Sequence, residues 1–131
     1  MSLATAYWCV LIAALLPYLW VAIAKASAPR YDNRDPRGWV ARQEHPRLKR
    51  AYNAHLNALE AFAPFAAAVV LAQMGGVAHP RIALLALVFV GLRVLHGVAY
   101  IADQAALRSL AWFGALACVL ALLVQAALSV A

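Results

Sequence analysis

The sequence predicts an all-α integral membrane protein in which four helices form one bundle and one domain, residues 1–131. Hydrophobic residues make up 66% of the chain and charged residues only 12%, and the mean hydropathy is +0.77. These values are far from those of ordinary soluble domains. The apolar residues also gather into four stretches, each long enough to cross a bilayer, for which about 20 residues suffice in a helix.

The four spans are predicted at about residues 3–24, 54–74, 82–101 and 109–131. The first holds no charged residue. Segment 25–50 is polar and rich in proline, which is typical of a loop with short turns. We expect the second helix to begin outside the bilayer near Pro46 and to end before Gly75 and Gly76.

Positive charge gathers beside the first span. The chain has 11 Lys and Arg against 5 Asp and Glu, and eight of these cations lie between Lys25 and Arg50. This placement next to a span indicates a contact with membrane lipids and sets the topology, and it argues against a nucleic-acid partner. Loops one and three are predicted to be cytoplasmic, with both termini on the opposite side of the membrane.

Polar side chains inside the second span mark a candidate site. On a helix, Asn53, Asn57 and Glu60 share one face, at roughly 0°, 40° and −20°. A carboxylate in hydrocarbon is costly and usually functional. The alternative is that Asn57 and Glu60 only join helices through hydrogen bonds. His55 points nearly the opposite way, so we expect it to face another helix or another subunit.

The third span carries a second polar face. Arg93, His96 and Tyr100 lie at roughly 0°, −60° and −20° on their helix. Glu60 and Arg93 are expected at similar depths, about 9 and 12 Å into the hydrocarbon, and therefore to form an ion pair. Arg93 contributes either to ligand binding or only to the structure of the helix bundle.

Arg108 and Ser109 are predicted to stand at the beginning of the fourth span. A guanidinium at a helix N-terminus adds its charge to the helix dipole and would stabilise a thiolate or carboxylate. The alternative is that Arg108 extends to phospholipid headgroups. Most groups of the predicted site are donors, which favours an anion. The four histidines have no spacing typical of a metal site.

These landmarks together resemble the MAPEG superfamily, the membrane-associated proteins in eicosanoid and glutathione metabolism, and its small bacterial members most. The resemblance rests on the run Arg50 to Glu60, then Pro64-Phe65, Arg93 to His96 with Tyr100, and Arg108-Ser109. It implies a homotrimer in the bacterial inner membrane, with glutathione as co-substrate bound between adjacent subunits. It also implies that Arg108 holds the thiolate and that Ser109 donates its hydroxyl. The candidate glutathione-binding residues are Asn57, Glu60, Arg93, His96 and Tyr100.

The expected function is that of an enzyme, a glutathione-dependent transferase or peroxidase acting on lipophilic electrophiles or lipid hydroperoxides. The membrane would concentrate this lipophilic partner while the cytoplasm supplies the thiol. The alternative is a non-catalytic scaffold or lipid-binding protein with a degenerate glutathione site. An ion or solute pathway is less well supported, since the charges lie in one leaflet only.

Overall fold

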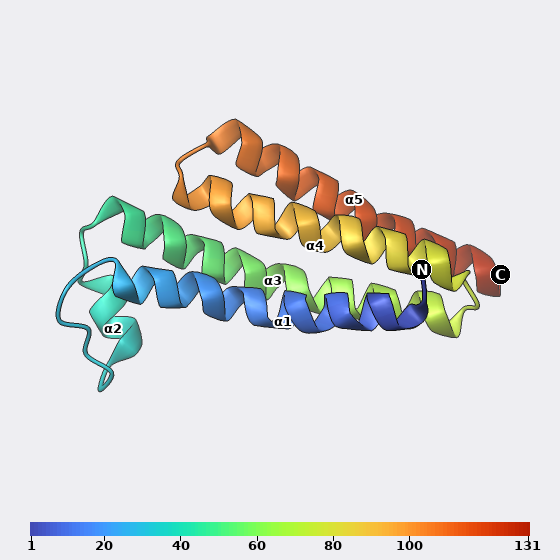
Figure 1. The fold of residues 1–131 in the computed structure, drawn as a ribbon, viewed down its shortest axis with the longest axis horizontal. Helices are drawn as coiled ribbons and strands as arrows, with labels where there is room; N and C mark the ends of the chain where they lie inside the picture. The colour runs from blue at the N-terminus through green and yellow to red at the C-terminus, as the bar shows by residue number, and fades with distance from the viewer.

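The computed structural model describes all residues, 1–131, and contains helices but no strands (Figure 1). Its five helices are α1 (Leu3–Ala26), α2 (Pro36–Ala41), α3 (Pro46–Met74), α4 (His79–Ile101) and α5 (Ala105–Val130). The four long helices, α1, α3, α4 and α5, are each long and apolar enough to cross a membrane. They run side by side, and both termini lie at the end of the bundle opposite α2 (Figure 1).

The helices begin and end close to the predicted positions, with two differences. Helix α3 begins at Pro46, as expected. Helix α5 begins at Ala105, four residues before the predicted span, because the residues ahead of Ser109 include good helix formers. The predicted loop 25–50 also contains the short helix α2, whose first turn is capped by the Asp35 carboxylate accepting from the Gly38 N–H at 3.1 Å.

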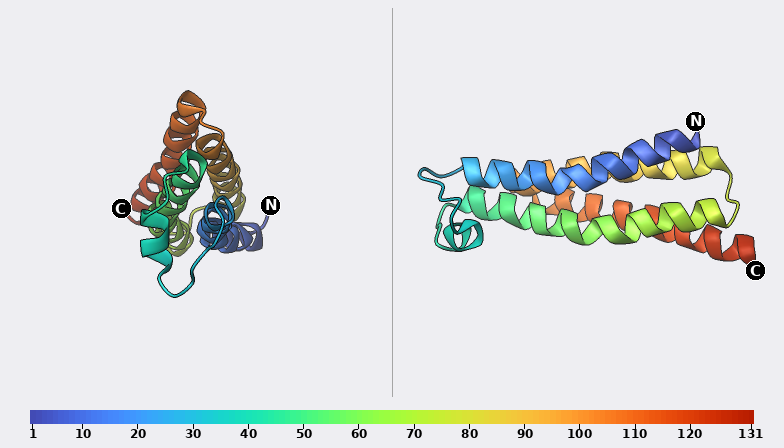
Figure 2. Two further views of the ribbon diagram at one scale, coloured as in Figure 1. Left: turned by 90° about the vertical axis from the view of Figure 1, so that its left-hand side faces the viewer. Right: turned by 90° about the horizontal axis from the view of Figure 1, so that it is seen from below.

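Small residues allow the helices to pack closely. Helix α1 lies along α3, and α4 lies along α5 (Figure 2). Many of the core residues are alanines, and the centre is filled by Phe65 and Phe89, whose rings stack with centroids 3.8 Å apart. Gly97 is in close contact with the Trp20 indole, and a Cβ at this position would overlap the ring. Such small residues at helix contacts are typical of membrane bundles.

The α2 end of the bundle has its own small core. Trp39 is buried there beside Leu48 and Ala51 of α3, and its indole N–H donates to the carbonyl oxygen of Arg30 at 2.9 Å. Deeper in the bundle, His55 Nδ1 lies 2.7 Å from the carbonyl oxygen of Pro17. His55 therefore faces another helix, α1, as predicted. These contacts fix α1, α2 and the first turns of α3 to one another.

The opposite end is held by two polar contacts between helices. The Tyr7 hydroxyl of α1 donates to the Gln73 side chain of α3. The Arg81 guanidinium of α4 donates to the Gln125 side chain of α5 at 3.1 Å. The first contact joins α1 to α3 and the second joins α4 to α5, and each of these pairs packs along its length. These polar side chains therefore contribute to the contacts between the helices.

Candidate functional site

The predicted site residues converge on two adjoining cavities between α3, α4 and α5. The first, which we call the Arg108 cavity, has a volume of about 240 Å³. It is lined by residues of all three helices: Asn57, His96, Tyr100, Arg108, Ser109, Trp112 and Phe113. Five of the seven predicted site residues are among them. The packing of α3, α4 and α5 thus brings together side chains that lie up to about fifty residues apart in the sequence.

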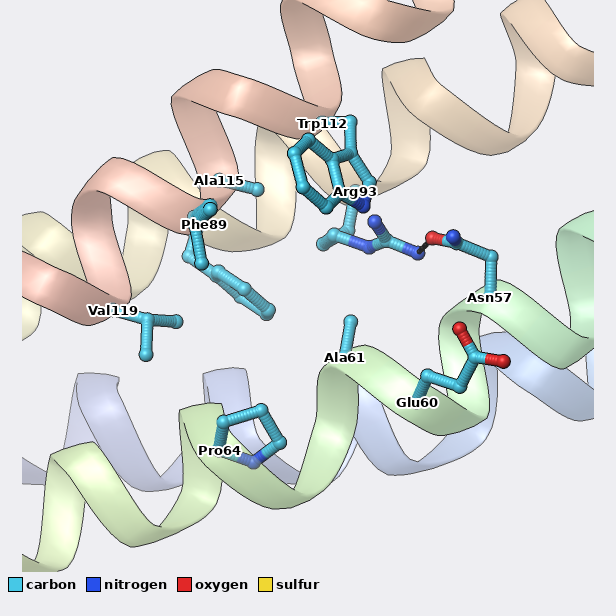
Figure 3. A pocket seen from close by; sticks show the side chains of 10 residues that line it. Asn57, Glu60, Ala61, Pro64, Phe89, Arg93, Trp112, Ala115 and Val119 are labelled. Carbon is cyan, nitrogen blue, oxygen red and sulfur yellow. Dashed lines mark hydrogen bonds between the residues drawn. The ribbon is translucent and has the colours of Figure 1, made fainter.

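The second cavity, which we call the Phe89 cavity, has a volume of about 170 Å³ (Figure 3). Its polar side is formed by Asn57, Glu60 and Arg93, and its other lining residues are mostly apolar: Ala61, Pro64, Phe89, Trp112, Ala115, Leu116 and Val119. Asn57 and Trp112 line both cavities. The two remaining predicted site residues, Glu60 and Arg93, therefore lie in a neighbouring space rather than in the Arg108 cavity.

The expected ion pair between Glu60 and Arg93 does not form. Arg93, which is only 4% exposed, donates from Nη2 to the Asn57 side-chain oxygen at 2.8 Å (Figure 3). All ion pairs of the chain lie at the α2 end, between Asp32 and Lys49. Asn57 and Glu60 are three residues apart, which corresponds to a rise of about 4.5 Å along the helix. An estimate of depth from the sequence is too coarse to tell which of the two residues contacts Arg93.

His96 is the most unusual polar group in the structure. It is 2% exposed, and its ring meets that of Tyr100 edge to face, with centroids 5.6 Å apart. Its Nδ1 is the only buried side-chain nitrogen or oxygen of the chain without a hydrogen-bond partner. Buried polar atoms nearly always have one, because leaving one unpaired costs about 1–3 kcal/mol. A polar group of a ligand would therefore be stabilised by binding here.

Arg108 lies against an aromatic face. Its guanidinium carbon is 4.7 Å from the centroid of the Tyr100 ring, a cation–π contact between α5 and α4. The prediction that Arg108 stands at the end of its helix is inaccurate, because α5 begins at Ala105 and the Arg108 N–H already donates to the carbonyl oxygen of Gln104. The free N–H groups of the helix dipole belong to the preceding residues, and Arg108 contributes mainly its own charge.

Two aromatic residues of the site were not predicted. Trp112 and Phe113 line the Arg108 cavity one helical turn after Arg108 and Ser109. Their spacing of four residues from the predicted pair is the signal that would have found them, because residues at i and i+4 share a helix face. Trp112 and Phe113 are 38% and 62% exposed, so they form the outer wall of the cavity.

The charges of the site favour an anionic ligand with a cationic group at one end. The Arg108 cavity contains a guanidinium and no carboxylate. The Phe89 cavity contains the guanidinium of Arg93 and one carboxylate, Glu60, which is exposed and makes no side-chain hydrogen bond in the chain. Such an arrangement fits a molecule that carries carboxylate or thiolate groups and one amine.

Comparison with known proteins gives one family. The family model described as MAPEG family matches residues 5–128, nearly the whole chain. No curated protein matches the chain.

Proposed function

The chain belongs to the MAPEG family, and from this membership and the two cavities we propose that it is a glutathione-dependent membrane enzyme. The family is associated with glutathione-related membrane transferases and peroxidases. The substrates would be lipophilic electrophiles or lipid hydroperoxides. The observation that carries the proposal is the convergence of Arg108, Tyr100 and the unpartnered His96 in one cavity.

In this proposal the Arg108 cavity takes the thiol end of glutathione. Arg108 would stabilise the thiolate by charge, and its contact with Tyr100 would hold the guanidinium in place. Ser109 has no hydrogen-bond partner for its hydroxyl, which remains free to donate to the sulfur. His96 Nδ1 would find its missing partner in a polar group of the tripeptide.

The polar side of the Phe89 cavity would take the amine end of glutathione. Glu60 supplies the acceptor that an ammonium group requires. Arg93 uses a single donor on Asn57, so its other donors are available to a carboxylate. Asn57 accepts a hydrogen bond from Arg93 and lines both cavities, so it would lie beside the middle of a ligand that occupies both.

The thiolate then performs nucleophilic substitution or reduction. With an electrophilic carbon, the sulfur forms a C–S bond and the leaving group departs with the bonding electrons. With a hydroperoxide, two glutathione molecules are oxidised to the disulfide while the hydroperoxide is reduced to an alcohol and water. In both cases the protein contributes thiolate stabilisation and proximity, which general principles place among the large rate effects.

A homotrimer would complete this site. Glu60 and Asn53 are exposed on α3, within or at the edge of the membrane-spanning part. A charged side chain facing hydrocarbon costs at least about 3 kcal/mol at mid-depth. Packing against other copies would cover both residues. Sedimentation or light scattering in detergent measures the number of copies, and a stable monomer would refute this part of the proposal.

The placement in the membrane follows from charge. The α2 end carries most of the cations, and three of its four acidic residues are paired with Arg34, Arg42 and Lys49. By the positive-inside rule this end would face the cytoplasm of a bacterial inner membrane, with both termini on the other side. Glutathione would then enter from the cytoplasm, on the side of the Arg108 cavity. Cysteine labelling of each end in intact cells tests the orientation.

Glutathione binding is the direct test. Calorimetry with the detergent-solubilised protein, combined with the ultraviolet absorbance of the thiolate, should show binding and ionisation of the thiol. Arg108→Ala should weaken binding about tenfold to hundredfold, because a hydrogen bond to a charged group contributes about 1.5–3 kcal/mol. Arg47→Ala is a matched control, since it removes the same charge from an exposed position that lines neither cavity.

Two results would count against the proposal. If millimolar glutathione does not bind, the site has another ligand. If Arg108→Ala and Arg47→Ala have equal thiolate absorbance and equal conjugation rates, Arg108 does not hold the sulfur.

A second candidate function is a non-catalytic membrane scaffold or lipid-binding protein. The buried hydrogen bond between Arg93 and Asn57 favours it, because this bond joins α4 to α3 without any ligand. The scaffold hypothesis predicts that Arg93→Met disrupts oligomers in crosslinking experiments, whereas Arg108→Ala leaves oligomers intact and changes no reaction rate. Conjugation activity lost in Arg108→Ala would exclude it.

A further inference from the structure

The end of α4 that carries Tyr100 is closed by a backbone motif. The last carbonyl groups of a helix have no donor within the helix and need partners outside it. The carbonyl oxygen of Ala99 accepts from the Gln104 N–H at 2.8 Å. That of Tyr100 accepts from the Asp103 N–H at 3.2 Å. With Asp103 in the left-handed conformation, these two bonds form a Schellman motif, which leaves the Ile101 carbonyl oxygen without a backbone donor.

Arg50 of α3 supplies the missing donor. Its Nε donates to the Ile101 carbonyl oxygen at 3.1 Å. The last turn of α4 contains no basic residue, so Arg50 also places a positive charge at the negative end of this helix. The Ile101 side chain packs against the small core at the α2 end, beside Leu48 and Ala51. The hydrogen bond and this packing together fasten the end of α4 to the first turns of α3.

The Arg50 bond connects all three helices that line the Arg108 cavity. The carbonyl oxygen of Gln104 accepts from the Arg108 N–H at 2.9 Å, in the first turn of α5. Tyr100 and Arg108 therefore lie on either side of a hydrogen-bonded turn, and Arg50 holds this turn against α3. Asn57 follows Arg50 on α3 by about two helical turns and lines the same cavity.

We propose that Arg50 is a positioning residue of the Arg108 cavity: its hydrogen bond to the end of α4 holds Tyr100 and Arg108 in place relative to α3. Arg50 lines neither cavity, so it acts through the backbone and not by contact with a ligand. This inference rests on the proposed function, because the side chains held in place are those assigned to the thiol end of glutathione. The bond itself lies within one chain and needs no ligand.

Three substitutions separate the hydrogen bond from the charge. In Arg50→Gln, the amide nitrogen of the new side chain occupies the place of Nε, so the donor stays and the charge is lost. In Arg50→Met, a methyl group stands at this place and both are lost. In Arg50→Lys, the charge stays, but the donor lies one bond farther from the backbone. Arg47→Met is the control, because Arg47 is exposed on the same helix and makes no side-chain hydrogen bond.

The first experiment needs no glutathione. Hydrogen exchange followed by mass spectrometry reports on the backbone amides of residues 102–104, which are bonded to the end of α4. Arg50→Met should speed their exchange about tenfold, as expected when a hydrogen bond from a charged group is lost. Arg50→Gln should be closer to the unaltered protein than Arg50→Lys is. Arg47→Met should leave the exchange unchanged.

A second measurement follows the cavity itself. Fluorine NMR of protein labelled with 5-fluorotryptophan gives one signal for each of the four tryptophans. Trp112→Phe identifies the signal of Trp112, which lines the cavity one turn after Arg108. This signal should shift in Arg50→Met and return in Arg50→Gln. The signal of Trp8, near the opposite end of the bundle, should stay in place in both variants.

Conjugation of glutathione to chlorodinitrobenzene measures the consequence for turnover. Arg50→Met and Arg50→Lys should each lower kcat/KM about tenfold, because a displacement of about 1 Å at a reacting group can cost up to a hundredfold. Arg50→Gln should lower it much less, although it lacks the charge. Arg47→Met should have the kcat/KM of the unaltered protein.

The outcomes separate this inference from the proposed function. A Trp112 signal that is unchanged in Arg50→Met overturns the inference, even if exchange is faster, because the bond then does not affect the cavity. It is also overturned if Arg50→Lys is closer to the unaltered protein than Arg50→Gln, since the charge would then be what matters. If Arg50→Met does not fold, this comparison decides alone. Absence of conjugation in the unaltered protein refutes the proposed function, while exchange and the fluorine signals still test the role of Arg50.

Discussion

Replacing Asn57 by leucine tests whether the buried Arg93 depends on a single partner. The Arg93 guanidinium is 4% exposed, and its one side-chain hydrogen bond is the 2.8 Å contact with Asn57. Asn57→Leu leaves a charge in an apolar bundle without this acceptor. We expect a loss of about 2–3 kcal/mol in the free energy of unfolding, because a hydrogen bond to a charged group contributes about 1.5–3 kcal/mol.

Two features of the structure set the size of this effect. Hydrogen bonds between membrane helices average only about 0.6 kcal/mol, so the cost comes mainly from the orphaned charge. Glu60 lies one turn from Asn57 and lines the same cavity, so it is the nearest carboxylate that can replace the lost acceptor. We therefore expect Glu60→Gln to add to the cost in the Asn57→Leu background and to have little effect in the unaltered protein.

A double variant tests whether the loss of stability in Asn57→Leu comes from the unpaired charge of Arg93. Arg93→Met removes the charge and leaves a half-buried amide that can bind water, so its cost should be about 1 kcal/mol. Adding Arg93→Met to Asn57→Leu should then restore stability by about 1–2 kcal/mol. The assay is reversible unfolding in mixed micelles, followed by circular dichroism, with Asn53→Leu as the control on the same helix.

The reasoning is refuted if the double variant is less stable than Asn57→Leu, or if the two single effects simply add. Either result would mean that Arg93 has no need of Asn57. An Asn53→Leu variant as unstable as Asn57→Leu would also count against it, because Asn53 is exposed and forms no side-chain hydrogen bond.

Two further predictions concern packing and the loop. Gly97→Ala should lower the unfolding temperature, because the added Cβ would overlap the Trp20 indole and overpacking costs about 1–3 kcal/mol. The control Gly91→Ala should be neutral or slightly stabilising, because no atom lies within reach of a Cβ at that position. In the loop, hydrogen bonds from Arg34 hold the pKa of the Asp32 carboxyl below its ordinary value of 3.8. The stabilisation by this contact is therefore present above the ordinary pKa and is lost as the pH falls through the lowered pKa, and Arg34→Gln should raise the pKa of Asp32 in an NMR titration.

The sequence was sufficient for the features that depend on composition and on periodicity within one helix. Four spans follow from apolar stretches of bilayer length, and all four helices are present. The polar faces of α3 and α4 follow from the angle of about 100° between successive residues. Together with the positive-inside rule, which predicts that these faces lie in one leaflet, this periodicity grouped Asn57, His96, Tyr100, Arg108 and Ser109, and the five residues line one cavity.

Features that depend on distances of a few ångströms between helices could not be predicted. The partner of Arg93 is Asn57 and not Glu60, a difference of one helical turn on α3. The start of α5 was missed because the length of the apolar span does not mark it; the helix begins at Ala105, directly after a connection in which Asp103 adopts a left-handed backbone conformation with φ of 62°. Whether His96 Nδ1 has a hydrogen-bond partner depends on the side chains of all three surrounding helices. The sequence pattern of one helix therefore does not predict that this atom is unpartnered.

Trp112 marks the boundary between the two cavities along α5. Its ring closes the Phe89 cavity on one side and the Arg108 cavity on the other. Arg108 and Ser109 precede it by one turn, toward the α2 end, and Ala115 and Val119 follow it toward the middle of the span. Along α5 the lining therefore changes from cationic to apolar within about two turns, roughly 11 Å. In the proposed function, the cationic end of this lining would stabilise the thiolate, and Trp112 would stand between it and the apolar space.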